Sequence, residues 1–315
     1  MEDTIVRPFV DGRDETAWID VWNRLYVGLP DTAPLTRDQY DVERSAPTFS
    51  AEGRFVAERR GQVVGWVHAR VSAPAPEADG SLRGPMVLPE CQRAGVDTLL
   101  LGRALGSFRA RGIKVVGARI REEDAALRAL LDRHGFKLSR LYSLMRRDLA
   151  ELPSRVGENP DVEIRELGFD DDDMRLGVNL MNETMAEHHN YRAISPEEAR
   201  YTHTATVKRG GGMFVHMALV AQEPAGIVIS WIDPEENEAL NRKRGSIGPL
   251  GVLRRFRHQG IGKALMLRGM RTLKEQGMEE AELGVDDTNP VKALRLYQQL
   301  GFAVVRKTLH LELTL

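Results

Sequence analysis

The chain repeats itself, and this repeat limits the folds open to it more than any other feature. The matching segments are residues 5–7 and 163–165, 64–67 and 225–228, 92–95 and 257–260, and 134–136 and 300–302. They occur in the same order, offset by roughly 160 residues, which is the size of one domain. Residues 150–160 between the copies are polar and contain two prolines and a glycine, a composition typical of a linker. We therefore expect two copies of one unit, 1–150 and 160–315.

Composition excludes several broad classes of protein. The 44 basic and 46 acidic residues leave a net charge of −2, which gives no general attraction to nucleic acid or to an anionic membrane. The single cysteine, Cys91, forms no internal disulfide and no cysteine metal cluster. The acidic start lacks a signal peptide, and no segment approaches the ~20 apolar residues of a membrane helix. We expect a cytoplasmic two-domain protein without nucleic-acid or membrane partners.

The spacing of apolar residues along the second copy predicts a mixed α/β order of strands and helices. Strands are expected at 162–167, 214–221, 226–231, 247–253, 281–285 and 309–315, and helices at 171–188, 196–208, 260–275 and 291–300. One strand–helix–strand unit among these should form a right-handed parallel crossover. The first copy has the same order, with residues 95–110 as the helix that matches 260–275.

The strongest chemical signal lies in residues 250–265. An apolar strand ends near Leu253, a basic loop follows, and Gly260 and Gly262 open a helix. A helix start leaves about four amides unpaired and carries about half a positive charge, and glycines let an anion approach those amides. A junction of this kind can also serve packing alone. Five groups that favour an anion, such as a diphosphate, surround it: Arg254, Arg255, Arg257, His258 and Lys263.

Two motifs together resemble a known family. Arg257, Gly260 and Gly262 after the strand are similar to the diphosphate loop of the GCN5-related N-acetyltransferases, which reads Gln or Arg, two residues, Gly, one residue, Gly or Ala. The second signature of that family is matched downstream by Asn289, Ala293, Tyr297, Gly301 and Phe302. The resemblance is good in the second copy and weak in the first. It implies two tandem acyl-CoA N-acyltransferase-like domains, each a mixed, largely antiparallel sheet with flanking helices.

The resemblance also implies a cofactor, acetyl-CoA, and the residues that hold it. In this family the fourth and fifth strands splay apart and expose backbone groups to the pantetheine arm, and Pro249 suits such an interrupted strand because proline donates no ladder hydrogen bond. Leu250 and Val252 would then present main-chain groups to this arm. The cofactor-binding residues expected in full are Leu250, Val252, Leu253, Arg257, His258, Gln259, Gly260, Ile261, Gly262, Lys263 and Asn289.

Tyr297 is the expected catalytic residue. When an amine attacks the thioester, the departing thiolate needs a proton, and a nearby phenol supplies it. The alternative is an aromatic side chain on the buried face of a short helix. The base that deprotonates the amine is left unassigned, and a relay through water stays open. The candidates are Glu187, His188, His189, His216, Asp233 and Glu235, with Ser246 where many relatives carry a carboxylate.

The first copy has lost the features that matter for cofactor binding. Asp97 stands where the second copy has Gly262, and a carboxylate there would repel a diphosphate. Leu131 occupies the position of Tyr297, and Glu123 or Asp124 that of the asparagine. We expect this copy to be structural or to shape the substrate site.

The expected function is transfer of an acetyl or short acyl group from acetyl-CoA to a primary amine of a small-molecule acceptor. The alternative is a non-catalytic protein that binds or senses coenzyme A. A nucleotide-binding loop is disfavoured because Ala264 follows Lys263 and offers no hydroxyl for magnesium. No metal is expected, since His188 and His189 are adjacent and diverge on a helix. The acceptor is unidentified, with residues 185–191 and the acidic loop 232–238 expected beside it. The oligomeric state is open, and the duplication is compatible with a monomer.

Overall fold

A computed structural model describes residues 4–71, 79–152, 161–189, 191–288 and 293–315. The chain divides into two compact units. The first unit consists of residues 1–141 and 307–315, and the second unit of residues 142–306. This division differs from the expected boundary at 150–160, and the two units are described in turn.

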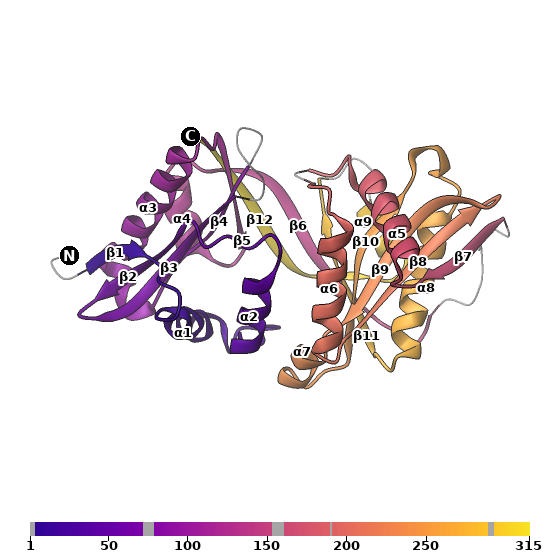
Figure 1. Cartoon of the computed structure of the whole chain (residues 1–315), viewed down its shortest axis with the longest axis horizontal. Coiled ribbons are helices and arrows are strands. Elements are labelled where there is room, and N and C mark those ends of the chain that lie inside the picture. Colours follow the sequence, from indigo (N-terminus) through magenta and orange to yellow (C-terminus); the bar gives the residue numbers. More distant parts are fainter. Residues whose placement is uncertain (1–3, 72–78, 153–160, 190, 289–292) are drawn as a thin grey trace. The chain divides into compact units, whose positions relative to one another are not determined.

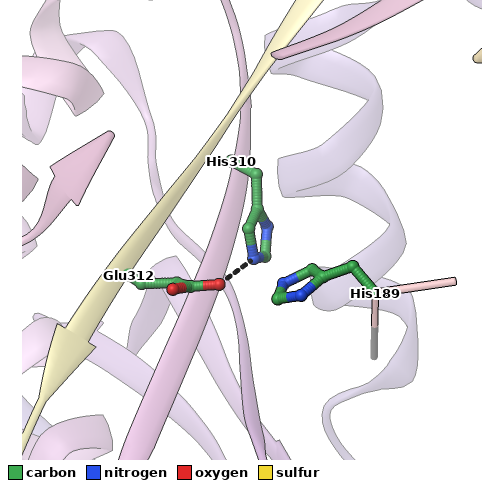
Figure 2. Close-up of side chains that lie close together, drawn as sticks. All are labelled: His189, His310 and Glu312. Atoms are coloured by element: carbon green, nitrogen blue, oxygen red, sulfur yellow. Dashed lines mark hydrogen bonds and ion pairs between the residues drawn. The ribbon is translucent and has the colours of Figure 1, made fainter. Parts of the chain in front are cut away.

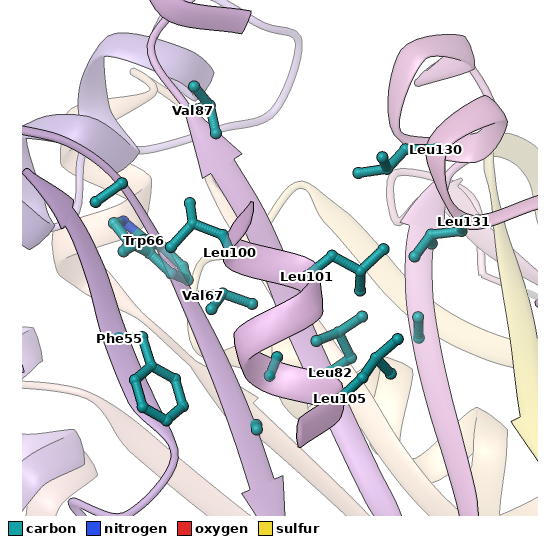
Figure 3. Close-up of a cluster of buried hydrophobic side chains, with 14 of the residues drawn as sticks. Phe55, Trp66, Val67, Leu82, Val87, Leu100, Leu101, Leu105, Leu130 and Leu131 are labelled. Atoms are coloured by element: carbon teal, nitrogen blue, oxygen red, sulfur yellow. The ribbon is translucent and has the colours of Figure 1, made fainter. Parts of the chain in front are cut away.

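The first unit is a mixed sheet with helices on both faces (Figure 1). Its elements are β1 (Thr4–Pro8), α1 (Glu15–Tyr26), α2 (Arg37–Ser45), β2 (Arg54–Arg59), β3 (Gln62–Val71), β4 (Gly80–Val87), the 3₁₀ turn η1 (Pro89–Ala94), α3 (Val96–Ala110), β5 (Val115–Arg121) and α4 (Ala125–Arg133). Strands β1 to β4 pair antiparallel in chain order, and β5 pairs parallel with β4. Helix α3 buries Leu100, Leu101 and Leu105 against this sheet, beside Trp66 and Leu82 (Figure 3).

The second unit repeats this order. Its elements are β7 (Val162–Leu167), α5 (Asp171–Met185), α6 (Pro196–Lys208), β8 (Gly212–Val220), β9 (Glu223–Ile232), α7 (Pro234–Ala239), β10 (Arg244–Val252), the turn η2 (Arg254–Phe256), α8 (Ile261–Glu275), β11 (Glu280–Asp286) and α9 (Ala293–Gln299). Helices α5 and α6 cover one face of β8–β10, and α8 covers the other (Figure 1). Among the described helices of the chain, none has the length and apolar character needed to cross a bilayer.

One element of the second unit was not expected. Residues 232–238 were predicted to be an acidic loop, whereas the structure forms the short helix α7 from Pro234 to Ala239. Asp233 caps this helix by accepting a hydrogen bond from the amide of Glu236, and Pro234 follows at the first helical position. Both residues favour a helix start, so the local sequence explains the difference.

The last strand of each sheet comes from a distant part of the chain. Residues 308–314 of β12 (Ala303–Thr314) pair antiparallel with β5 in the first unit. Residues 142–148 of β6 (Lys137–Asp148) pair antiparallel with β11 in the second unit. The sequence analysis placed the strand 309–315 in the second copy, whereas the structure places residues 307–315 in the first unit.

The side chains of β12 fit β5 specifically. The ring of His310 lies over Gly117 of β5, where an added Cβ would meet it at 2.6 Å, and its Nε2 is 3.2 Å from a carboxylate oxygen of Glu312 (Figure 2). Leu309 and Leu311 of the same strand are buried in the core of the first unit. The missing side chain at Gly117 thus makes room for the imidazole.

Both sheets splay at the same place. In the first unit, β4 and β5 pair only at residues 80–82 and 116–118. In the second unit, β10 and β11 pair only at 244–246 and 280–282, although both strands continue beyond. The splay between the fourth and fifth strands that the sequence predicts is therefore confirmed, as is the mixed α/β fold class.

The place of β12 in the first unit leads to a prediction about stability. Leu311 of β12 is 0% exposed in the first unit, and Leu283 of β11 is 4% exposed in the second. Burial of a leucine in a well-packed core predicts that Leu311→Ala destabilises the first unit by about 2–5 kcal/mol and that Leu283→Ala acts likewise on the second. Urea unfolding in a Trp231→Phe background follows the first unit alone, since it contains Trp18, Trp22 and Trp66. An unchanged unfolding midpoint for Leu311→Ala would contradict the placement of β12 in the core of the first unit.

Candidate active site

The site lies where β10 parts from β11. From Ile247 onward, the edge of β10 that faces β11 has no strand partner within residues 161–189 and 191–288. On its other edge, the pairing with β9 shifts between Ile247 and Leu250, so Gly248 and Pro249 form a bulge. Backbone groups along such an open edge are strong donors and acceptors that need a partner. This open edge can pair with an extended, amide-containing ligand, and the contacts expected of Leu250 and Val252 stay a prediction.

The start of α8 lies just beyond this strand and offers an anion site. Ala264 donates the first helical hydrogen bond, to the carbonyl of Gly260 at 3.0 Å. The amides of Ile261, Gly262 and Lys263 have no acceptor among the described residues, and no side chain caps the helix. Gly260 adopts a left-handed φ of 81°, and nothing lies within 4 Å of where its Cβ would be. Bare amides, an open approach and the helix dipole together suit a diphosphate.

Arg257 holds the loop between β10 and α8 in place. Its Nε donates to the carbonyl of Val252 at 3.1 Å, and its Nη1 donates to Glu187 at 2.9 Å. This hydrogen bond lowers the pKa of Glu187 below its usual range. The guanidinium thus positions the loop, and its expected contact with a diphosphate stays a prediction. His258 beside it is exposed, with a left-handed φ of 65°.

The remaining residues expected at the cofactor take different positions. The side chain of Leu253 is buried, and its amide donates to the carbonyl of Ala225 at 2.9 Å. Ile261 is also buried, so only its main chain can serve a ligand. Gln259 is exposed, and its side-chain nitrogen Nε2 donates to the carbonyl of Arg255 at 3.4 Å. Lys263 is half-buried. Asn289 lies outside the described residues.

Tyr297 lies in α9 with 8% of its surface exposed. Burial raises the pKa of this phenol to about 12, so it stays protonated at neutral pH. Its ring packs edge-on against Phe302 with the ring centroids 6.2 Å apart. A buried phenol that keeps its proton can donate a hydrogen bond, and a proton as the carbon–sulfur bond breaks, to a sulfur atom beside it.

Three further candidate bases make contacts with arginine side chains in the structure. Asp233 and Glu235 both accept hydrogen bonds from Arg209, at 2.7 and 3.0 Å. His216 is buried on the face of the sheet that α8 covers, where Arg268 donates to its Nε2 at 3.2 Å. Burial lowers the pKa of His216 to about 4. These side chains are engaged in structural contacts, and the base is still unassigned.

The sequence analysis missed an apolar pocket between α5, α6 and the sheet. The pocket has a volume of about 300 Å³ and reaches from Met174 and Ala199 on the helices to Trp231 and Pro249 on the strands. An alignment of the helical segments of the two copies would have indicated this pocket, because large residues of the first copy correspond to small residues of the second.

The first unit has the same junction with different chemistry. Gln92 donates to the carbonyl of Val87 at 3.2 Å, as Arg257 does to Val252. However, the carboxylate of Asp97 accepts the amide of Thr98 at 2.8 Å in the first turn of α3. This carboxylate occupies the positive end of the helix itself. Leu131, at the position of Tyr297, is 0% exposed (Figure 3).

Comparison with known proteins identifies the class. The model of the Acetyltransferase (GNAT) family matches the chain twice, over residues 18–136 and 178–302. The chain therefore belongs to this family, as the two motifs of the second copy indicated. The solved structure of a tandem GNAT protein from the clavulanic acid biosynthesis pathway is 18% identical with a TM-score of 0.74, and the match covers 99% of this chain and 98% of that one. A GCN5-related N-acetyltransferase from Sphaerobacter thermophilus, also 18% identical, matches with a TM-score of 0.65 over 99% of this chain and 95% of that one.

Particular relatives are also similar in sequence. A mycothiol acetyltransferase of Streptomyces griseus subsp. griseus is 30% identical over 135 residues, which are 43% of this chain and 43% of that protein. This alignment spans less than half the length of the relative. A mycothiol acetyltransferase of Parafrankia sp. is 28% identical over 284 residues, covering 82% of each chain.

The bare helix start yields a binding prediction with a matched control. Gly262→Asp copies Asp97 of the first unit and places a carboxylate among the amides of α8. Charge repulsion and loss of the dipole contribution should weaken coenzyme A binding roughly tenfold or more, while the helix itself gains stability from the acidic residue. In Gly262→Ala the Cβ would lie 3.6 Å from Leu296, an ordinary contact, so we expect near wild-type affinity.

Calorimetric titration of coenzyme A into both variants measures this difference. Equal affinities of the aspartate and alanine variants would remove the helix start from the binding site.

Proposed function

We propose that this protein transfers an acetyl group from acetyl-CoA to a primary amine of a small molecule, and that the second unit carries the reaction. The observation that carries this proposal is the open edge of β10 followed at once by the uncapped start of α8. An extended arm with amides fits the first feature and a diphosphate fits the second. Coenzyme A combines these two chemical groups in one molecule. The mycothiol acetyltransferases among the relatives support a small-molecule acceptor.

The reaction has a simple proton balance. The amine nitrogen forms a bond to the thioester carbonyl carbon and loses one proton, while the carbon–sulfur bond breaks and the sulfur gains one. We assign Tyr297 as the donor of the proton to sulfur. Its pKa of about 12 keeps the donor protonated before each turnover. The proton lost from nitrogen returns to the phenolate through water, because the carboxylates expected as bases are held by arginines.

We propose that the first unit binds no coenzyme A and serves a structural or substrate-shaping role. The carboxylate of Asp97 interacts with the positive end of α3. The buried Leu131, which stands at the position of Tyr297, has no hydroxyl. The whole chain should accordingly bind one coenzyme A, a stoichiometry that the calorimetric titration also measures.

The role of Tyr297 yields a kinetic prediction. Tyr297→Phe retains the ring that packs on Phe302 and removes only the hydroxyl, so thermal unfolding and the affinity for coenzyme A should stay unchanged. The turnover number should fall roughly 10²- to 10⁴-fold, the usual contribution of a general acid. In the wild type the phenol keeps its proton until the pH approaches 12. We therefore expect no alkaline loss of turnover from this group below about pH 10.

Release of free thiol from acetyl-CoA, followed across a panel of primary amines, measures these rates. A variant that turns over at the wild-type rate would exclude Tyr297 from proton transfer. A protein that binds coenzyme A but releases no thiol with any amine would support the alternative of a non-catalytic binding protein.

A further inference from the structure

Among the described residues of the first unit, aromatic side chains fill the place that the apolar pocket takes in the second, and the repeat shows which residues correspond. Asn23 in α1 and Asn182 in α5 make the same pair of hydrogen bonds to a residue twelve positions later. Thirteen positions after each asparagine, Thr36 and Ser195 begin the next helix with the same capping box. The helical segments of the two units therefore align residue by residue.

In this alignment three large aromatic residues of the first unit correspond to three smaller residues of the second. Trp18 corresponds to Gly177 and Tyr40 to Ala199, and Trp66 on the matching strand corresponds to Ile227. In the first unit Trp18 stacks on Trp66 with the ring centroids 3.9 Å apart, and all three aromatics are at most 5% exposed. Their rings fill the space between the helices and the sheet.

In the second unit the smaller residues leave that space open. Gly177, Ala199 and Ile227 all line the pocket of about 300 Å³. This volume is roughly twice that of an apolar cavity known to take up benzene, about 150 Å³. It falls at the lower end of the range for small-molecule sites. The second unit thus carries a cavity of ligand size where its twin carries a filled core.

The pocket offers a ligand almost no unsatisfied polar group. The hydroxyls of Thr202 and Thr206 donate to carbonyls of their own helix, at 3.0 and 2.9 Å. The carboxylate of Asp173 accepts from Arg165 and from the amide of Gly168. The rest of the lining is aliphatic or aromatic, with Trp231 as the largest residue. A hydroxylated or charged ligand would lose its hydration there without replacement, whereas an apolar body would gain from burial.

The position of the pocket relates it to the reaction. Its lining comes from α5, α6 and the strands beneath them, and these two helices cover the face of the sheet opposite α8 (Figure 1). It reaches β10 at Pro249, inside the bulge and one residue before Leu250. The loop that contributes Ile194 is fixed by Asn182, which accepts from the amide of Ile194 at 3.1 Å and from the hydroxyl of Tyr191 at 2.6 Å. Hydrogen bonds thus hold one wall of the pocket, and the pocket reaches the strand that we assign to the pantetheine arm.

We propose that this pocket holds the apolar body of the acceptor, so that the substrate class is a primary amine carrying an aromatic or branched aliphatic group. This inference rests on the proposed function. The apolar group would fill the space that Trp18 and Tyr40 fill in the first unit, and the amine would be directed toward Pro249. Sugar amines and hydroxylated amines fit this pocket poorly.

Two amines and one pair of variants test the inference. 2-Phenylethylamine and ethanolamine share a primary amine and differ in the body that the pocket would receive. We expect kcat/KM with acetyl-CoA to be roughly 10- to 100-fold higher for 2-phenylethylamine, the gain from burying a phenyl group. Ala199→Phe fills the pocket and should raise the KM for 2-phenylethylamine at least tenfold, with the KM for acetyl-CoA unchanged. Val207→Phe adds the same side chain to α6 at a position that is 52% exposed and outside the lining, and serves as the control.

Direct binding of 2-phenylethylamine, measured by calorimetry in the same proteins, separates the two proposals. Binding that Ala199→Phe abolishes, without transfer to any amine, supports the pocket and contradicts the proposed function. Transfer to ethanolamine at an equal or higher kcat/KM leaves the function standing and overturns the apolar acceptor. A preference for octanoyl-CoA over acetyl-CoA that Ala199→Phe removes would assign the pocket to the acyl chain, and would also overturn it.

Discussion

The parallel pairing of β10 with β11 ends after three residues, and the candidate site depends on that early end. Two strands that stay paired would satisfy each other's backbone and leave nothing for a ligand. Here β10 parts from β11 after Ser246 while it stays paired with β9 on both sides of the bulge at Gly248 and Pro249, and the chain then continues through η2 to the uncapped start of α8. One continuous segment of about twenty residues thus presents an open strand edge and a positive helix end. Side chains such as Arg257 hold this segment in shape, while the main chain provides the groups that a ligand would contact.

The two units share one fold and differ in the residues at the helix start and beneath the paired helices. Both units keep the splayed strands, the loop anchored on a strand carbonyl and the helices joined by an asparagine. In the first unit, Asp97 satisfies an amide at the helix start, and aromatic rings fill the space between the helices and the sheet. In the second unit, the corresponding positions carry glycine and small or aliphatic residues. Burial of aromatic surface stabilises a core, whereas an open pocket forgoes this stabilisation and gains room for a ligand.

The sequence predicted much of this architecture because its signals are local. The repeat, the order of strands and helices and the glycines at the start of α8 can be recognised from spacing and residue type, and the family resemblance of the second copy implies the splay. The partner of the closing strand could not be predicted, because β5 and β11 offer equivalent edges and an alternating strand fits either. The choice depends on a tertiary contact, the ring of His310 over Gly117. The hydrogen bond of Arg257 to Glu187 and the apolar pocket were missed for the same reason, since each joins residues far apart in the chain.

The central claim is that the main-chain amides at the start of α8 bind a diphosphate and that those at the start of α3 do not. Amide hydrogen exchange, measured on the whole chain with and without coenzyme A, tests it at the level of single residues. The account predicts new protection at Gly260, Ile261, Gly262 and Lys263 on addition of coenzyme A, and no change at residues 95–98. Unchanged exchange at 260–263 would contradict it, as would equal protection at the two helix starts.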